Sequence, residues 1–225
     1  MNKIIKSSRF TMSILLVFMT LFCFSLSIFR YYVSETKVFF FLNWNLFLAW
    51  IPFLLSSFIG AFKIKSKTSL VLIIIVWILF FPNSPYILTD LFHLKMRDSI
   101  PVWYDLIVIL SYAWTGLICG FISLHDIEKL LSENGKKRMV TGIVVLFLFM
   151  SSFGVYLGRF LRWNSWDVFN DPSGLLGDII IRFIDPTEYS GTWGLTFLMG
   201  IMLNCMYFTF KLMESNEKTV IEAEK

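Results

Sequence analysis

The sequence predicts an all-α, polytopic integral membrane protein, and three observations support this fold class. Of the 225 residues, 56% are hydrophobic, and the mean hydropathy is +0.69. Only 16% of the residues are charged, whereas a soluble domain carries roughly 25%. The apolar residues gather in runs of about 20, the length that a helix needs to cross the hydrocarbon core of a membrane. This composition excludes soluble enzymes, secreted disulfide scaffolds, nucleic-acid binders and disordered chains.

Six runs are long and apolar enough to be spanning helices. We take the whole chain, residues 1–225, as one membrane domain with spans at about 10–29, 43–62, 68–81, 103–124, 139–157 and 193–210. The first run follows Lys3, Lys6 and Arg9, as a signal peptide would. Its apolar part is longer than the 7–15 residues of a typical signal peptide, and no small-residue cleavage motif follows. We therefore expect an uncleaved first helix.

The third run is the shortest, because Pro82 follows it directly and Pro85 comes soon after. Proline removes a backbone donor and disfavours helix in the residue before it. Lipid does not tolerate unsatisfied backbone groups, so this break must lie at the membrane surface or be packed against protein. Two interpretations remain open: an ordinary helix end with a turn, or a broken helix that lines a cavity.

The segment between the fifth and sixth runs predicts an amphipathic helix over 172–185 that lies flat on the outer surface of the membrane. Asp171 and Pro172 are typical of an N-cap and a first helical residue. Apolar residues then recur at helical spacing on one face, while Asp178 and Arg182 lie four apart, away from that face. About 14 residues are too few to cross the bilayer, so we expect no seventh span here.

The distribution of basic residues predicts the orientation. When alternate connecting segments are added up, one side carries thirteen Lys and Arg residues and the other carries seven. The side with more basic residues is normally cytoplasmic. We therefore expect both termini in the cytoplasm, the segment 158–192 outside, and the protein in the plasma membrane of a bacterium.

The interior of the six runs contains small residues but no ionisable ones. Gly116 and Gly120 are four apart, as are Gly154 and Gly158, a spacing typical of helix packing seams in membranes. No Asp, Glu, Lys, Arg or His lies deep inside any run. Ion- and proton-coupled transporters usually need such a group near the midplane, so this absence weighs against a pump or a proton antiporter.

Six polar residues on the predicted outer side form the candidate site: Asp90, His93, Asp105, Arg159, Arg162 and Asp167. If helix resumes after Pro85, Asp90 and His93 share one face, and the other four lie at the same membrane level. The two arginines can pair with the carboxylates or hold an anionic head group. The alternative to a binding or catalytic site is interfacial anchoring with structural ion pairs. We expect no metal, because one histidine with carboxylates is a thin ligand set for zinc.

The same polar residues lie in segments that are unusual for membrane sequence, namely PNSPYILTDLFHL from Pro82, WYDL from Trp103 and GRFLRWNSWDV from Gly158. With NLFLAWIP from Asn45, they resemble the family catalogued as domain of unknown function 1361. The resemblance extends from about the second run to the sixth. It implies an uncharacterised bacterial integral membrane protein and brings no activity, substrate or catalytic residue with it.

Motifs of known catalysts, such as HExxH, GxSxG, the P-loop and GxGxxG, are missing from the sequence. We therefore expect a non-enzymatic membrane component, either transporter-like or a subunit of a complex, without a cofactor. Its expected partners are the lipid bilayer, anionic lipid head groups or other membrane proteins, and not nucleic acid. Two alternatives remain: an enzyme that acts on lipid or cell-envelope material at the outer face, and a passive scaffold.

Overall fold

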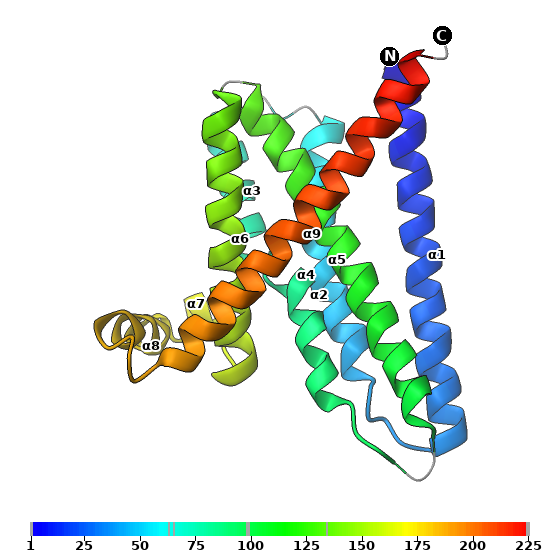
Figure 1. The fold of residues 1–225 in the computed structure, drawn as a ribbon, viewed down its shortest axis with the longest axis vertical. Coiled ribbons are helices and arrows are strands. Elements are labelled where there is room, and N and C mark those ends of the chain that lie inside the picture. The colour runs from blue at the N-terminus through cyan, green and yellow to red at the C-terminus, as the bar shows by residue number, and fades with distance from the viewer. Residues whose placement is uncertain (1, 63, 65, 98–99, 134, 224–225) are drawn as a thin grey trace.

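The computed structural model is a bundle of helices joined by short loops (Figure 1). It describes residues 2–62, 64, 66–97, 100–133 and 135–223, and among these the side chains of residues 9–214. In this part of the chain, six helices are long and apolar enough to cross a membrane, which confirms the predicted all-α membrane bundle. They are Arg9–Ser34, Phe41–Phe62, Lys67–His93, Val102–Ser132, Lys137–Phe160 and Ser190–Glu214.

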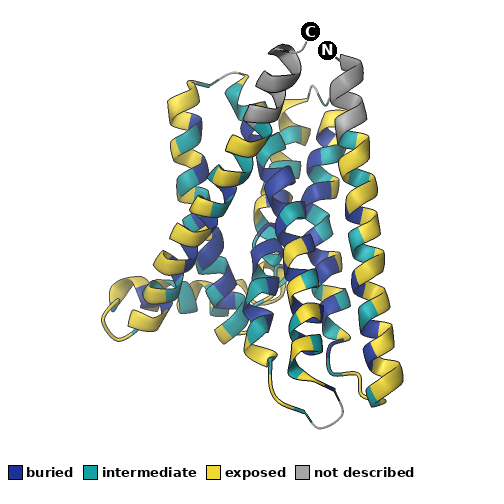
Figure 2. Ribbon diagram, turned by 45° about the vertical axis from the view of Figure 1, so that its right-hand side comes forward, coloured by how far each residue is buried: buried dark blue, intermediate teal, exposed yellow. Residues whose placement is uncertain are grey.

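Three long helices, α1 (Asn2–Ser34), α2 (Phe41–Phe62) and α5 (Val102–Ser132), form what we call the first helix group. Helix α5 packs against both of the others, and its contact with α2 is extensive. Figure 2 shows that α5 is largely buried, whereas much of the surface of α1 is exposed. Exposed apolar side chains are expected here, because lipid tails are as apolar as the side chains that face them.

The second helix group is built on α6 (Lys137–Phe160) and α9 (Ser190–Ala223), which pack extensively against each other before α9 diverges toward α5 and α1 (Figure 1). A Cβ atom on Gly200 of α9 would lie 2.2 Å from the ring of Phe149 on α6, so the close approach of the two helices requires glycine here. In Figure 1, α9 runs diagonally across the front of α5 and thereby connects the two groups.

Two short helices, α7 (Asp167–Asn170) and α8 (Pro172–Ile184), complete the second group. Asp171 caps α8 by accepting the backbone N–H of the residue three positions on, as the sequence predicts. Arg182 is buried and pairs with Asp178 at 3.0 Å, so the polar face of α8 is turned toward the bundle. Several apolar side chains of the helix remain exposed: Leu176, Ile180, Phe183 and Ile184.

The third span does not end at residue 81. Helix α3 (Lys67–Phe80) turns at Pro82 and continues as the single turn α4 (Asn83–Tyr86) and the 3-10 helix η1 (Ile87–His93). Together these elements form a candidate span of 27 residues with its break in the middle. Of the two interpretations of the prolines, the broken helix describes the structure, but the broken turn itself is packed against neighbouring helices and does not line an open cavity.

The break is packed against protein, and glycines of two neighbouring helices make this possible. A Cβ atom on Gly120 of α5 would lie 2.7 Å from the Cβ of Ser84, and one on Gly154 of α6 would lie 3.0 Å from the ring of Pro82. Ser84 is fully buried and donates a hydrogen bond to the carbonyl of Ala49. The backbone of α4 is therefore enclosed between α2, α5 and α6 and is shielded from lipid.

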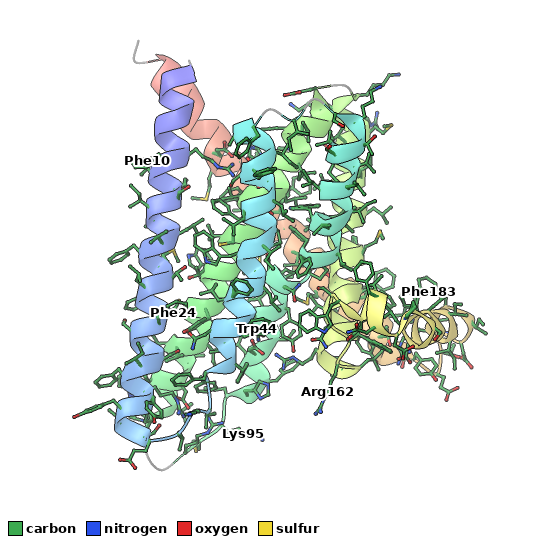
Figure 3. All side chains as sticks on the ribbon, turned by 180° about the vertical axis from the view of Figure 1, so that it is seen from behind. Phe10, Phe24, Trp44, Lys95, Arg162 and Phe183 are labelled. Carbon is green, nitrogen blue, oxygen red and sulfur yellow. The ribbon has the colours of Figure 1, made fainter. Side chains whose placement is uncertain are left out.

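The N-terminal end of α1 and the C-terminal end of α9 lie at the same end of the bundle (Figure 1). We call this the terminal end and the opposite one the distal end. Lys95 and Arg162 both lie toward the distal end, as Figure 3 shows. All six residues of the candidate site belong to segments that lie toward this distal end: η1, the start of α5, the end of α6, the turn that follows it and the first residue of α7.

Candidate functional site

Three of the six candidate residues meet at one point of the distal half. Arg159, near the end of α6, forms an ion pair with Asp90 of η1. Its Nε donates to the hydroxyl of Thr89 at 2.8 Å, and its Nη1 lies 3.0 Å from Nε2 of His93. A single arginine of the second helix group thus holds three side chains of the broken third span.

The carboxylate of Asp90 is fully buried at the centre of this arrangement. Asn45 of α2 donates to its second oxygen at 2.8 Å. The guanidinium of Arg159 lies over the ring of Tyr86, 4.7 Å from the centroid, and only 11% of the arginine side chain is exposed. A buried carboxylate needs such partners, because an unpaired charge in a low-dielectric interior is very costly.

We call this set of side chains the distal junction: Asn45, Tyr86, Thr89, Asp90, His93 and Arg159. Arginine can only donate, so Nε2 of His93 accepts from it, and the imidazole is neutral with its proton on Nδ1. Asp90 is therefore engaged within the protein, whereas His93 contacts Arg159 at the exposed edge of this set. The arrangement fixes two groups of helices relative to each other.

The two sequence segments PNSPYILTDLFHL and GRFLRWNSWDV are neighbours in the fold. Asn83 donates to the hydroxyl of Ser165 at 3.0 Å, and Ser165 donates to the carbonyl of Leu79. A Cβ atom on Gly158 would lie 3.2 Å from the ring of Tyr86, so glycine permits the contact directly beneath Arg159. The unusual residues of both segments thus build one interface between the broken span and the second helix group.

Asp105 lies in a different cluster, at the start of α5. It is fully buried and pairs with Arg30 of α1 at 2.7 Å and with Arg97 at 3.1 Å. The ring of Phe39 stacks against both guanidiniums, at 4.7 and 5.3 Å from its centroid. All four residues belong to the first helix group or its connecting loops, so this cluster holds that group together.

Arg162 and Asp167 also stay outside the distal junction. Arg162 follows the end of α6 with φ 63°, its side chain is exposed, and Figure 3 shows it pointing away from the helices. Asp167 accepts the backbone N–H of Asn164 at 2.7 Å, and this hydrogen bond holds the pKa of its carboxyl below the ordinary value. Asp167 therefore stabilises the turn before α7.

Charged residues at the terminal end form a further cluster that the sequence reasoning did not identify. Lys211 of α9 pairs with Glu128 of α5, which also accepts a hydrogen bond from Tyr207 at 2.6 Å. His125 lies 2.8 Å from Glu214. We call these residues, with Lys129, the proximal cluster. Their spacing is the sequence feature that reveals them, since intervals of three and four place each set on one helix face.

Groups of three or more His, Cys, Asp and Glu residues that could hold a metal ion are missing from the described part of the chain. The arginine-centred contacts of the distal junction are therefore its main chemical feature.

The comparisons with known proteins identify a family and nothing beyond it. A family model described as "Protein of unknown function (DUF1361)" matches residues 44–206, well over half of the chain. The matched range includes every member of the distal junction. Searches of curated proteins and of solved structures gave no match.

Proposed function

The chain belongs to the DUF1361 family, whose description assigns no activity, and we propose that it is a non-enzymatic, transporter-like membrane component. In this proposal the second helix group moves against the first, and the distal junction acts as the gate that closes the outer end. Gates of this kind, between two helix bundles that rock around a site, are common among transporters.

One observation carries this proposal: Arg159 reaches from the second helix group to three polar side chains of the broken third span in the distal half. Its partners Thr89, Asp90 and His93 all lie on η1. Directed polar contacts lose their strength when they lengthen by about an ångström, because hydrogen bonds depend steeply on distance and angle. A small displacement of α6 would therefore release all three contacts together.

The terminal half is held in a different way, which gives the motion a pivot. Buried apolar side chains of α3, α5, α6 and α9 pack there into one core: Trp77, Phe121, Leu124, Val144, Leu148, Leu203 and Tyr207 are among its members. Closely packed interiors resist separation. Opening at the distal end, around this core and the enclosed turn α4, is thus the motion that the packing favours.

The alternative of a membrane-embedded enzyme receives less support from the geometry. A general acid or base must reach a substrate atom directly or through one water molecule. Asp90 is fully buried and held by Asn45 and Arg159. A passive scaffold remains the other alternative, and it differs from a gate because it requires no motion.

Spin-label distances in lipid nanodiscs test the proposal. A cross-group pair at Lys37 and Ser173 should give a broad or bimodal distance distribution, which shifts to longer distances in Arg159→Ala. Two control pairs should stay narrow: Lys37 with Lys95, within the first group and its loops, and Gly60 with Lys136, across the groups at the terminal end. One narrow cross-group distance, identical in the wild type and the variant, would refute the gate.

The proposed orientation places the distal end outside and both termini in the cytoplasm of a bacterial cell, in contact with the lipid of the plasma membrane. Single cysteines at Lys136 and Ser173, in a variant without Cys23, Cys119 and Cys205, can be probed on intact cells with an impermeant thiol reagent. We expect labelling at 173 and protection at 136. The reverse pattern would show the opposite topology, with both termini outside the cell.

A further inference from the structure

A hollow of about 520 Å³ lies where the two helix groups meet, next to the distal junction. Its walls come from α1, η1, α5 and α9, and in Figure 1 α9 crosses α5 beside α1. The lining residues are mostly apolar: Met19, Phe22, Leu88, Ile107, Leu110, Ser111, Ala113, Trp114, Thr115, Leu117 and Met206. None of them carries a charge.

The hollow opens toward the bilayer. Trp114 is 54% exposed and Phe22 is 47% exposed, and both lie in candidate membrane spans. The two hydroxyl groups of the lining are satisfied within α5, since Ser111 donates to the carbonyl of Ile107 and Thr115 donates to that of Ser111. The walls therefore offer an apolar surface, which suits a hydrocarbon chain and not an ion or a sugar.

The hollow follows the length of α5. Its lining on this helix, from Ile107 to Leu117, extends over about 15 Å, at 1.5 Å per residue. An elongated apolar hollow of this kind suits a hydrocarbon chain that lies along the helix. A second copy of the chain is the other occupant that the experiment must distinguish.

The hollow shares a wall with the distal junction. Leu88 lines the hollow, and the next two residues, Thr89 and Asp90, are the partners of Arg159. Met206 belongs to the second helix group, whereas the other lining residues belong to the first group or to η1. Motion of α9 and α6 would therefore change the shape of the hollow and the contacts of the junction together.

We propose that this hollow binds the acyl chain of a membrane phospholipid that enters from the bilayer in the distal half. The proposal rests on the proposed function, because it names the substrate class that the gate would admit. A lipid is a fitting substrate for the geometry, since its chain would lie beside Trp114 while its polar part remains near the level of η1.

Photo-crosslinking in nanodiscs tests this, with phosphatidylglycerol that carries a diazirine in one acyl chain. Trp114 and Ile75 of α3 are both 54% exposed, so they form a matched pair of lipid-facing positions. We expect about tenfold more adducts at Ser111 and Trp114 than at Ile75, the ratio that corresponds to roughly 1.4 kcal/mol of extra binding.

Ser111→Phe fills the hollow and should abolish the enrichment there, while adducts at Ile75 stay unchanged. Ser25→Phe is the matched control, because Ser25 also lies on a spanning helix and also donates to a backbone carbonyl, that of Phe22. It should leave the enrichment intact. The Lys37–Lys95 spin-label distance shows in both variants whether the first group has folded.

Two outcomes would overturn the proposal. Adducts in equal density at Trp114 and Ile75, insensitive to Ser111→Phe, would mean that the hollow holds only bulk lipid. Disulfide-linked dimers of Ser111→Cys would mean that another copy of the chain covers it. Neither result depends on motion between the helix groups, so failure here is distinguishable from failure of the gate, which the cross-group distances report.

Discussion

The distal junction and the proximal cluster both connect α5 or η1 to the second helix group, and yet they differ in how they do so. At the distal junction one cation meets one carboxylate, and Asp90 is 0% exposed. In the proximal cluster Glu128 is also buried, at 6%, but its partner Lys211 is 27% exposed and Lys129 is 55% exposed, whereas Arg159 is 11% exposed.

Both clusters border the same apolar core, at Tyr207 in the proximal cluster and at Tyr86 in the distal junction, but the contacts of Arg159 with η1 are themselves polar. This difference shows which end can act as a switch. A dry ion pair with fixed geometry is either made or broken, and breaking it leaves an uncompensated charge. A network whose cations are open to solvent tolerates the loss of one of them, since water and the remaining partners replace it. The predictions below test this contrast, from the largest expected effect to the smallest.

Replacing Arg159 by alanine should have the largest effect, because Asp90 would remain buried without its cation. We expect a loss of about 3–5 kcal/mol in the free energy of unfolding, measured by denaturant titration in detergent micelles. The double variant Asp90→Leu/Arg159→Met removes both charges and should recover most of this loss. If the double variant is as unstable as Arg159→Ala, the unpaired buried charge of Asp90 is not the cause of the lost stability.

Replacing Lys211 by alanine should cost only about 1 kcal/mol, by the same titration. Glu128 keeps the hydrogen bond from Tyr207, and the adjacent apolar core keeps α5 and α9 together. The cross-group distance between Gly60 and Lys136 should also remain unchanged. A loss as large as that of Arg159→Ala would show that the two ends are held equally, and the contrast would fail.

Much of the fold could be predicted because the features that determine it are local. Apolar runs of spanning length gave the six helices, and the cap at Asp171 gave the start of α8. Asp90 and His93 could be placed together because three residues make one turn of a 3-10 helix and nearly one turn of an α-helix. Their meeting with Arg159 followed from a shared membrane level.

The features that could not be predicted depend on how the helices are arranged around one another. From the sequence, Asp105 is expected at the same membrane level as Asp90, and yet its partner is Arg30 on α1, because α1 and η1 lie on different sides of α5 (Figure 1). No pattern of residues along the sequence predicts on which side of α5 each of these helices lies. Likewise, the prolines of the third span indicate a break, but only the glycines of α5 and α6 that face it explain why the break is buried.

The helix end at Arg162 allows a smaller test at the edge of the distal junction. The residue adopts φ 63°, a conformation that usually falls to glycine at helix C-termini. Arg162→Gly should relieve the strain and raise the free energy of unfolding by up to about 1 kcal/mol. Arg162→Ala retains a Cβ atom and should bring no gain. If both variants are equally stable, the backbone strain at this position is negligible.

The smallest effect concerns the pH dependence of the turn before α7. The backbone N–H of Asn164 holds the pKa of Asp167 below its ordinary value of about 4. A carboxyl whose pKa is lowered by folding contributes stability above its unfolded pKa, and that contribution is lost as the pH falls through the folded pKa. The turn should therefore be ordered at neutral pH and loosen only below about pH 4. A spin label at Phe169, which is exposed, reports the mobility of this turn.

In Asp167→Asn the amide oxygen can still accept from the backbone N–H of Asn164 and does not titrate, so the acid-induced increase in mobility should disappear. The spectra of the variant and the wild type should then differ only in acid, and an identical acid transition in both would assign the titration to another group.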